Sequence, residues 1–430
     1  MRLNEDFLHY IWQYRLLTRL DLYCTDGAKL EIIDTGSPNT HAGPDFSSAR
    51  LRIAGTLWAG NVEIHVKASE WLLHHHQQDR LYDTVILHVV YEDDAVICRT
   101  DGSLIPVLLL KDLIPDDMLQ RYRSLLDGRS FFPCAGQISQ ADPAIIRKVL
   151  DTMAAERLAE KSAELEVLMV KNKYNWNETF HQLLIRNFGF KVNTIPFELL
   201  AAELPATLLG RHRNQALQIE ALLFGQAGFL EGDFVDSYPR QLQAEYVFLR
   251  KKYQLVPLDP SLWRFLRMHP QNFPVLRIAQ LAGMLTGNTP AIPDILAAGK
   301  LPSLISLFTP VSVHPYWKDH SHFDKICKPM ELRLGRKSVD ILIINVVCVI
   351  LYHYGGYFGI PEIRQRSVSF LKSIPAEDNG VVRKYKAAGL KLKSACDSQA
   401  ILQLHKNYCA TKKCLNCAVG IDIVTKRDSI

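Results

Sequence analysis

The feature that most constrains the fold is a short alternation of apolar and polar residues, Val62-Glu63-Ile64-His65-Val66-Lys67. In a β-strand, side chains two residues apart lie on the same face of the sheet. Glu63, His65 and Lys67 would therefore share one face, and the apolar residues between them would be buried on the other. Polar side chains on an inner face are costly unless they pair, bind a metal or take part in chemistry. This strand is therefore the first candidate for a functional site.

An acidic residue precedes this strand on a turn. Asp45 lies in the segment Gly43-Pro44-Asp45-Phe46, eighteen residues before Glu63. Hard oxygen ligands from Asp45 and Glu63 would hold Mg²⁺ or Mn²⁺, and the metal would polarise a phosphate and lower the pKa of an attacking water. His65 or Lys67 would position that water or offset the developing charge. The pattern therefore predicts a metal-dependent nuclease site. The alternative is a half-buried strand with charged residues on a solvated face.

The elements predicted up to residue 91 are a helix, three strands, a helix and a strand. The helix covers residues 5–20, and residues 84–91 form an apolar run that is typical of a central strand. This order resembles the core of the PD-(D/E)XK nuclease fold. In that superfamily a lysine usually stands two residues after the glutamate, whereas this chain has His65 there and a lysine at Lys67. The departure leaves two alternatives, a histidine-based variant or a non-catalytic fold.

A polar segment follows the strand and begins with three adjacent histidines, residues 74–76. If the segment is helical, Gln78 and Tyr82 lie on one face, four residues apart. RecB-like nucleases carry a Q-x-x-x-Y pair in this place, so the resemblance implies that both residues line the catalytic pocket. His76 with Asp79 is a second candidate pair, as metal ligands or as supporting groups. A polar, exposed loop is the alternative interpretation of the same residues.

Cysteine usage predicts a second metal site. Nine cysteines in a chain without a recognisable export signal argue against a disulfide framework. Cys409, Cys414 and Cys417 form a C-x4-C-x2-C pattern, which favours a structural zinc ion or iron–sulfur cluster. The fourth ligand remains open among three residues: Cys396, His405 and Cys24.

Length and hydrophobicity indicate an α+β architecture. A chain of 430 residues predicts two or three domains. Helical patterns dominate from about Pro143, so we expect an α/β, mixed-sheet, nuclease-like domain at residues 1–135 and a mainly helical domain with the cysteine cluster at residues 136–430. No apolar run reaches the roughly twenty residues that span a bilayer. The densest run, residues 341–352, is interrupted by Asn345 and predicts a buried helix.

Charge and motifs limit the possible functions. The formal net charge of +5 permits contact with DNA or RNA without requiring it. The sequence has no phosphate-binding P-loop, dinucleotide fingerprint or nucleophile elbow, so ATP-driven, NAD-linked and α/β-hydrolase functions lack support. We expect a cytoplasmic protein without a membrane segment. A non-enzymatic scaffold whose helical region binds a protein partner is the alternative to the nuclease, and the sequence identifies no such partner.

Six segments also resemble a bacterial family described as a domain of unknown function. They are GPDFSSARLRIAG, GNVEIHVKASEW, YDTVILHVVYEDD, QIEALLFGQAGFL, HPQNFPVLRIAQLAG and YCATKKCLNCAVG. The resemblance covers nearly the whole chain and implies a bacterial, cytosolic protein in which these blocks belong together. It implies no activity, because the nuclease hypothesis rests on the strand and its acids.

Overall fold

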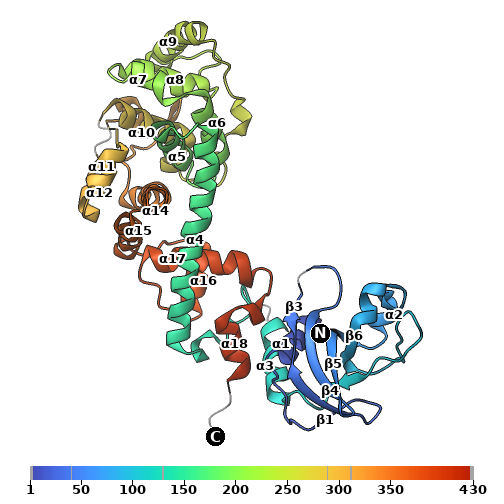
Figure 1. Cartoon of the computed structure of the whole chain (residues 1–430). Coiled ribbons are helices and arrows are strands. Elements are labelled where there is room, and N and C mark those ends of the chain that lie inside the picture. The colour runs from blue at the N-terminus through green and yellow to red at the C-terminus, as the bar shows by residue number, and fades with distance from the viewer. Residues whose placement is uncertain (1–2, 40, 128–129, 288, 310–311, 427–430) are drawn as a thin grey trace. The chain divides into compact units, whose positions relative to one another are not determined.

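A computed structural model describes residues 3–39, 41–127, 130–287, 289–309 and 312–426, and Figure 1 shows the course of the chain. The described residues form two compact units. The first draws on Met1–Leu150, Arg383–Lys391 and Leu404–Ile430, and the second on Asp151–Val382 and Leu392–Gln403. The predicted mixed sheet followed by a mainly helical region is confirmed. An independent domain ending at residue 135 stays a prediction.

The first unit contains a seven-stranded mixed sheet (Figure 1). The strand order is β1-β2-β4-β5-β6-β7, and β3 pairs with β4. Neighbours from β1 to β5 run antiparallel, whereas β6 is parallel to β5 and β7 is parallel to β6. The strands are β1 (Leu22–Tyr23), β2 (Lys29–Asp34), β3 (Ser37–Pro38), β4 (Phe46–Ile53), β5 (Thr56–Lys67), β6 (Val85–Glu92) and β7 (Val107–Leu109).

Strand β5 is buried on both faces in the part that carries the predicted site. Glu63 is 4% exposed and His65 2% exposed, while Val62 and Ile64 are fully buried. Two helices contact this strand, α1 (Glu5–Gln13) and α2 (Glu70–Leu73). The polar face of β5 is thus covered by protein, so its charged and polar atoms must find partners there.

The helical interpretation of the segment from His74 to Tyr82 is wrong, although a short helix precedes it. Helix α2 ends at Leu73, and two short 3₁₀ turns follow, η1 (His76–Gln78) and η2 (Arg80–Thr84). His75 adopts a left-handed conformation with φ of 62°. Asp79 is extended, and its side chain accepts a hydrogen bond from the Leu81 N–H group at 2.9 Å. These two residues stop helix propagation, so the i,i+4 relation between Gln78 and Tyr82 does not apply.

Three further helices belong to the first unit, two of them wholly and α16 (Gly380–Ala387) in part. The other two are α3 (Asp116–Asp127) and α18 (Ala418–Thr425). Helix α4 (Pro143–Lys171) begins where the sequence predicted a change to helix. Asp142 caps it by accepting a hydrogen bond from the Ala144 N–H group at 2.7 Å, and Pro143 takes the first helical position, where no N–H partner is needed.

The second unit is built from helices. They are α5 (Trp176–Phe188), α6 (Thr194–Glu203), α7 (Ala206–Arg211), α8 (Ala216–Gln226), α9 (Ser237–Tyr253), α10 (Pro274–Thr286), α11 (Ile292–Ala297), α12 (Leu301–Phe308), α13 (Arg336–Leu342), α14 (Cys348–Tyr357), α15 (Pro361–Ser373) and α17 (Ala395–Leu404). These helices agree with the helical patterns that were expected from about Pro143 onwards. Every residue of α10 from Pro274 to Leu285 is buried, which makes this helix central to the core.

A long apolar helix runs from Arg336 to Tyr357 and includes α13, the π-turn η7 (Ile343–Val347) and α14. It is long and apolar enough to cross a membrane, but 72% of its most apolar stretch is buried inside the protein. Asn345 is satisfied within this packing, because its side chain donates to the Ile341 carbonyl at 2.9 Å and accepts from Lys161 Nζ at 2.7 Å. The helix therefore packs as the predicted buried core helix.

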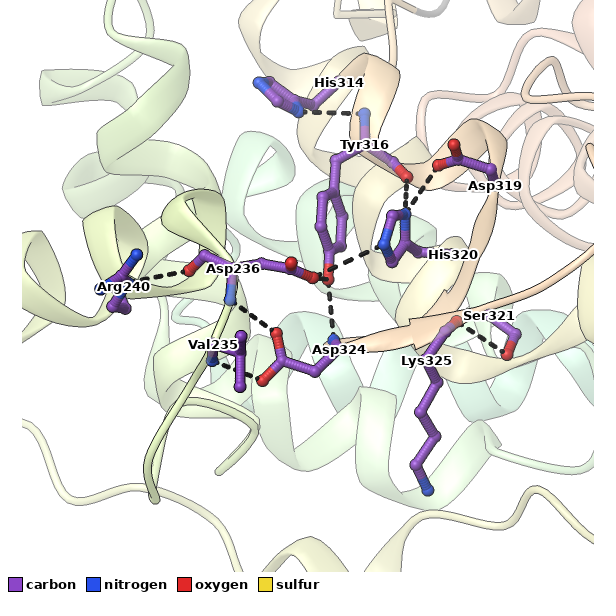
Figure 2. Close-up of polar contacts among 10 residues, drawn as sticks. All are labelled: Val235, Asp236, Arg240, His314, Tyr316, Asp319, His320, Ser321, Asp324 and Lys325. Carbon is purple, nitrogen blue, oxygen red and sulfur yellow. Dashed lines mark hydrogen bonds and ion pairs between the residues drawn. The ribbon is translucent and has the colours of Figure 1, made fainter.

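A polar network fastens the hairpin of β8 (His320–His322) and β9 (Lys325–Ile326) to the start of α9 (Figure 2). The Asp324 carboxylate accepts hydrogen bonds from the Val235 and Asp236 N–H groups at 2.9 Å each. The Tyr316 hydroxyl donates to the Asp236 carboxylate at 2.8 Å and accepts from the Asp324 N–H group at 2.8 Å. Because these groups satisfy one another, we interpret the network as structural.

Close packing of α8 against α9 gives a test of this core. A Cβ atom added to Gly225 would lie 2.1 Å from the Tyr246 ring. We expect Gly225→Ala to lower the free energy of unfolding by about 1–3 kcal/mol, because overpacking displaces a buried ring. Gly210→Ala in α7 is the matched control, since nothing lies within 4 Å of its added Cβ. The control should be neutral or gain up to about 1 kcal/mol. Equal effects in urea unfolding would contradict the packing argument.

Candidate metal centre

Strand register brings the predicted acids to one place. Phe46, the first residue of β4, pairs with Val62 on β5, so Asp45 arrives next to Glu63. The Asp45 N–H group donates to Glu63 Oε2 at 3.0 Å, and the Ile64 N–H group donates to Asp45 Oδ2 at 3.0 Å. These reciprocal bonds hold the two acidic residues together at the start of β4.

Two histidines lie against the other oxygen of Glu63, and a third lies beside them. Glu63 Oε1 lies 3.4 Å from His76 Nε2 and 3.5 Å from His65 Nε2. His65 Nε2 lies 3.2 Å from His74 Nδ1. One ring nitrogen from each of His65, His74 and His76 lies within 4.8 Å of the other two. These three ring nitrogens are close enough together to hold one metal ion, and imidazole is a common ligand of transition metals.

A fourth histidine lies behind the first. The parallel register of β5 and β6 pairs Glu63 with His88, which is fully buried. His65 Nδ1 and His88 Nε2 are 2.8 Å apart and share a hydrogen bond. In the tautomer in which His65 Nδ1 donates, its Nε2 keeps a lone pair that faces Glu63, His74 and His76. His88 thus has the place of the outer partner that orients a metal-binding histidine.

Burial dominates the electrostatics of these groups. Burial, followed by the neighbouring histidines, lowers the pKa of His65 to about 2, and burial lowers that of His88 to about 3. Both rings are therefore neutral near pH 7, as metal ligation requires. Burial raises the pKa of Glu63, and Asp45 adds to this effect, while His76 and the Asp45 N–H group act against it. A buried carboxylate beside neutral rings would gain most from a bound cation.

Helix α1 contributes two groups that sequence analysis missed. Burial and then the charge of Asp45 raise the pKa of Glu5 to about 7. His9 Nε2 lies 3.2 Å from Asp45 Oδ2. The side chains of His9 and Asp45 are 30% and 26% exposed, so this side of the cluster faces solvent. Glu5 and His9 are one helical turn apart, and this spacing was the available signal.

His74 and His88 are two further residues of the cluster to which the sequence analysis assigned no role. His74 belongs to the three-histidine run, but residue type alone did not show which of the three would face inward. His88 interrupts the apolar run of β6, and a histidine inside a buried strand is itself a signal of pairing or ligation.

The remaining predicted residues divide into two groups. Tyr82 belongs to the cluster, because its ring stacks on His76 with centroids 3.7 Å apart. Lys67 forms an ion pair with Glu92 at 3.0 Å and its side chain is 47% exposed. Gln78 and Asp79 are exposed, and Asp79 caps the turn η2. The structure therefore assembles Asp45, Glu63, His65, His76 and Tyr82.

The predicted thiol ligands lie in different parts of the fold. Cys409, Cys414 and Cys417 belong to the C-terminal segment of the first unit, whereas Cys396 lies on α17 in the second unit. Cys24 is buried directly after β1.

Fold and cluster together define an α+β protein with a buried carboxylate–histidine centre suited to a metal. The family model "Protein of unknown function (DUF2851)" matches residues 5–380, so the chain belongs to this family. The expected membership in a family of unknown function is thereby confirmed. No curated protein and no solved structure matches the chain. The matched range includes the histidine cluster, whereas the C-terminal cysteine pattern lies beyond it.

His88 provides a test of the cluster as a metal site. His88→Leu removes the bond to His65 while keeping a similar volume. We expect the affinity for Mn²⁺ or Zn²⁺ to fall about 10- to 100-fold, as is typical when an outer partner of a metal ligand is lost. His88→Gln, whose amide oxygen can still accept from His65, should lose less. Isothermal titration calorimetry on protein freed of metal by a chelator measures the metal affinity of both variants. Unchanged affinity in both would show that His88 does not support the site.

The depressed pKa of His88 also predicts a pH dependence of stability. An unfolded histidine titrates near 6.5, so the unfolded chain takes up a proton below that pH while the folded protein does not. The contribution of the neutral His88 ring to the free energy of unfolding is fully present above about pH 6.5. It is lost as the pH falls towards 3. In EDTA, the melting temperature of the wild type should therefore fall more steeply from pH 7 to 5 than that of His88→Leu. Parallel profiles would contradict a buried neutral ring at this position.

Proposed function

We propose that the protein is a metal-dependent phosphodiester hydrolase that acts on DNA or RNA. The observation that carries the proposal is the position of Glu63. One of its oxygens accepts from the Asp45 N–H group, while the other faces His65 and His76 within 3.5 Å. A metal at this point would have hard oxygen and imidazole ligands, and its partly exposed side would face His9.

The order and direction of the elements support a nuclease of the PD-(D/E)XK type. Helix α1 is followed by antiparallel β2, β4 and β5, then by α2 and by β6, which runs parallel to β5. Asp45 stands directly before β4 and Glu63 lies on β5, the two positions that the sequence hypothesis gave to the metal-binding acids.

The chemistry is divided among the named groups. Asp45, Glu63 and an inward histidine would hold the metal, which lowers the pKa of its bound water and stabilises charge on the phosphate. His65 occupies the place of the usual lysine, and its neutral ring cannot supply a permanent positive charge. Lys67 does not replace that charge at Glu63 in this arrangement, because it pairs with Glu92. Imidazole ligands make Mn²⁺ a better candidate than Mg²⁺, which prefers an all-oxygen shell.

Cleavage assays test this proposal. Plasmid DNA, single-stranded DNA and single-stranded RNA would be incubated with the protein in Mn²⁺ or Mg²⁺. We expect Mn²⁺-dependent cleavage that falls more than about 100-fold in Glu63→Gln, a larger loss than that expected for an outer partner. Glu31→Gln is the matched control, because Glu31 is a carboxylate of the same sheet that pairs with Arg52 on the surface. It should retain full activity.

The outcomes separate the alternatives. Cleavage that persists in Glu63→Gln would place the activity elsewhere or in a contaminant. Absence of cleavage on every substrate, in protein shown to be loaded with metal, would overturn the proposal in favour of the non-enzymatic scaffold.

A further inference from the structure

The C-terminal cysteines lie in a tight series of turns. Cys409 ends the π-turn η8 (His405–Cys409), and Cys414 begins the 3₁₀ turn η9 (Cys414–Asn416). The Lys412 N–H group donates to the Cys409 carbonyl at 3.2 Å, and the Cys417 N–H group donates to the Cys414 carbonyl at 3.2 Å. Cys417 then caps α18. The fold therefore gathers these three thiols into one short loop.

Gly420 shows how closely this loop packs. A Cβ atom at this position would lie 2.2 Å from the Cys414 carbonyl oxygen, a backbone atom that cannot move independently. The first turn of α18 therefore lies directly against the loop that carries Cys414.

A fourth cysteine, Cys134, lies on a turn whose two sides both contact the C-terminal segment. Before it, Phe131 stacks on His405 with centroids 4.5 Å apart, and Phe132 stacks on Tyr385 at 3.9 Å. After it, the 3₁₀ turn η3 (Ile138–Gln140) packs against α18. Lys412 Nζ adds a hydrogen bond to the Leu126 carbonyl at 3.1 Å.

Electrostatic interactions agree with this packing. Burial raises the pKa of the Cys134 thiol, and the next contributions come from Cys409, Cys417 and Cys414. Burial likewise raises the pKa of Cys409 to about 12, while a hydrogen bond with the Tyr385 side chain acts against it. Four thiols, two of buried and two of half-buried cysteines, thus share one neighbourhood.

We propose that Cys134, Cys409, Cys414 and Cys417 bind a [4Fe–4S] cluster. Cys134 supplies the ligand that the C-x4-C-x2-C pattern lacks. Among the earlier candidates, His405 forms a hydrogen bond with the Tyr385 hydroxyl, and Cys396 lies in the second unit with Cys348 as a neighbour. The inference is independent of the proposed hydrolase function.

The spacing of the thiols bears on the choice between a single zinc ion and an iron–sulfur cluster. Four sulfurs around one zinc ion, at a Zn–S distance of 2.3 Å, would lie roughly 3.8 Å apart. In the part of the chain that the structure describes, only His65, His74 and His76 bring three ligand atoms within 4.8 Å of one another. No three of the four cysteine sulfurs, all of which the structure describes, lie within 4.8 Å of one another, so they are spaced more widely than around a single zinc ion. The proposal therefore adopts a larger centre with four thiolate ligands.

Anaerobic purification of the full chain tests the assignment. We expect a brown protein with broad visible absorbance and roughly four iron and four sulfide per chain, before or after reconstitution with iron and sulfide. Cys134→Ser and Cys409→Ser should each lose most of the iron and absorbance. The matched controls Cys396→Ser and Cys98→Ser should keep them, and Glu63→Gln should also keep them.

Thiol labelling of the wild type provides a measurement that needs no variant to fold. With the cluster intact, an alkylating reagent followed by mass spectrometry should leave the four proposed ligands unmodified. After oxidative removal of the cluster, the four should become reactive together. Stoichiometric zinc in place of iron would overturn the cluster. Protein without either metal after reconstitution, or a Cys134 that reacts independently of the other three, would overturn the four-cysteine site.

Discussion

The burial of the Glu63 carboxylate is the constraint on which the first unit depends. Only 4% of this residue is exposed, so its charge has lost most of its hydration. The groups that contact its oxygens are the Asp45 N–H group and the rings of His65 and His76, and none of them carries a permanent charge. A carboxylate in such surroundings is stable when it is protonated or when a cation joins it. His65 on β5 and His76 on η1 both face Glu63 Oε1, which is where the proposed cation would bind.

The replacement of a lysine by His65 changes how such a centre obtains positive charge. A lysine ammonium is a compact permanent charge, and it would neutralise Glu63 or Asp45 without a metal. A neutral imidazole can instead donate a lone pair to a metal, and the bond to His88 holds its ring in place. Under the proposed function, the departure from the usual motif would therefore give His65 a role in ligation in place of direct charge pairing.

The sequence predicted the parts of this site that depend on short-range rules. The period of two on β5 placed Glu63 and His65 on a common face, and the turn before β4 identified Asp45. His88 could not be placed from sequence, because its position depends on the parallel register of β5 and β6 across a crossover. The contributions of Glu5 and His9 depend on how α1 packs. The helix expected after α2 failed because His75 takes a left-handed conformation and Asp79 caps its own turn. The mixed sheet and the helical region could be predicted because the spacing of apolar residues along the chain differs between strands and helices.

The difference between short-range sequence patterns and long-range packing also applies to the cysteines. Cys409, Cys414 and Cys417 are recognisable because they are close in sequence, whereas the whole second unit lies between Cys134 and these three residues in the sequence. Bringing distant segments together costs conformational entropy, and the cost rises only slowly with the length of the intervening chain. Stacking of Phe131 and Phe132 on His405 and Tyr385 already holds the two segments together. A cluster bound only by the closed arrangement would add its binding free energy to the free energy of folding. Its effect would be greatest at this junction, where the C-terminal segment completes a unit that begins at the other end of the chain.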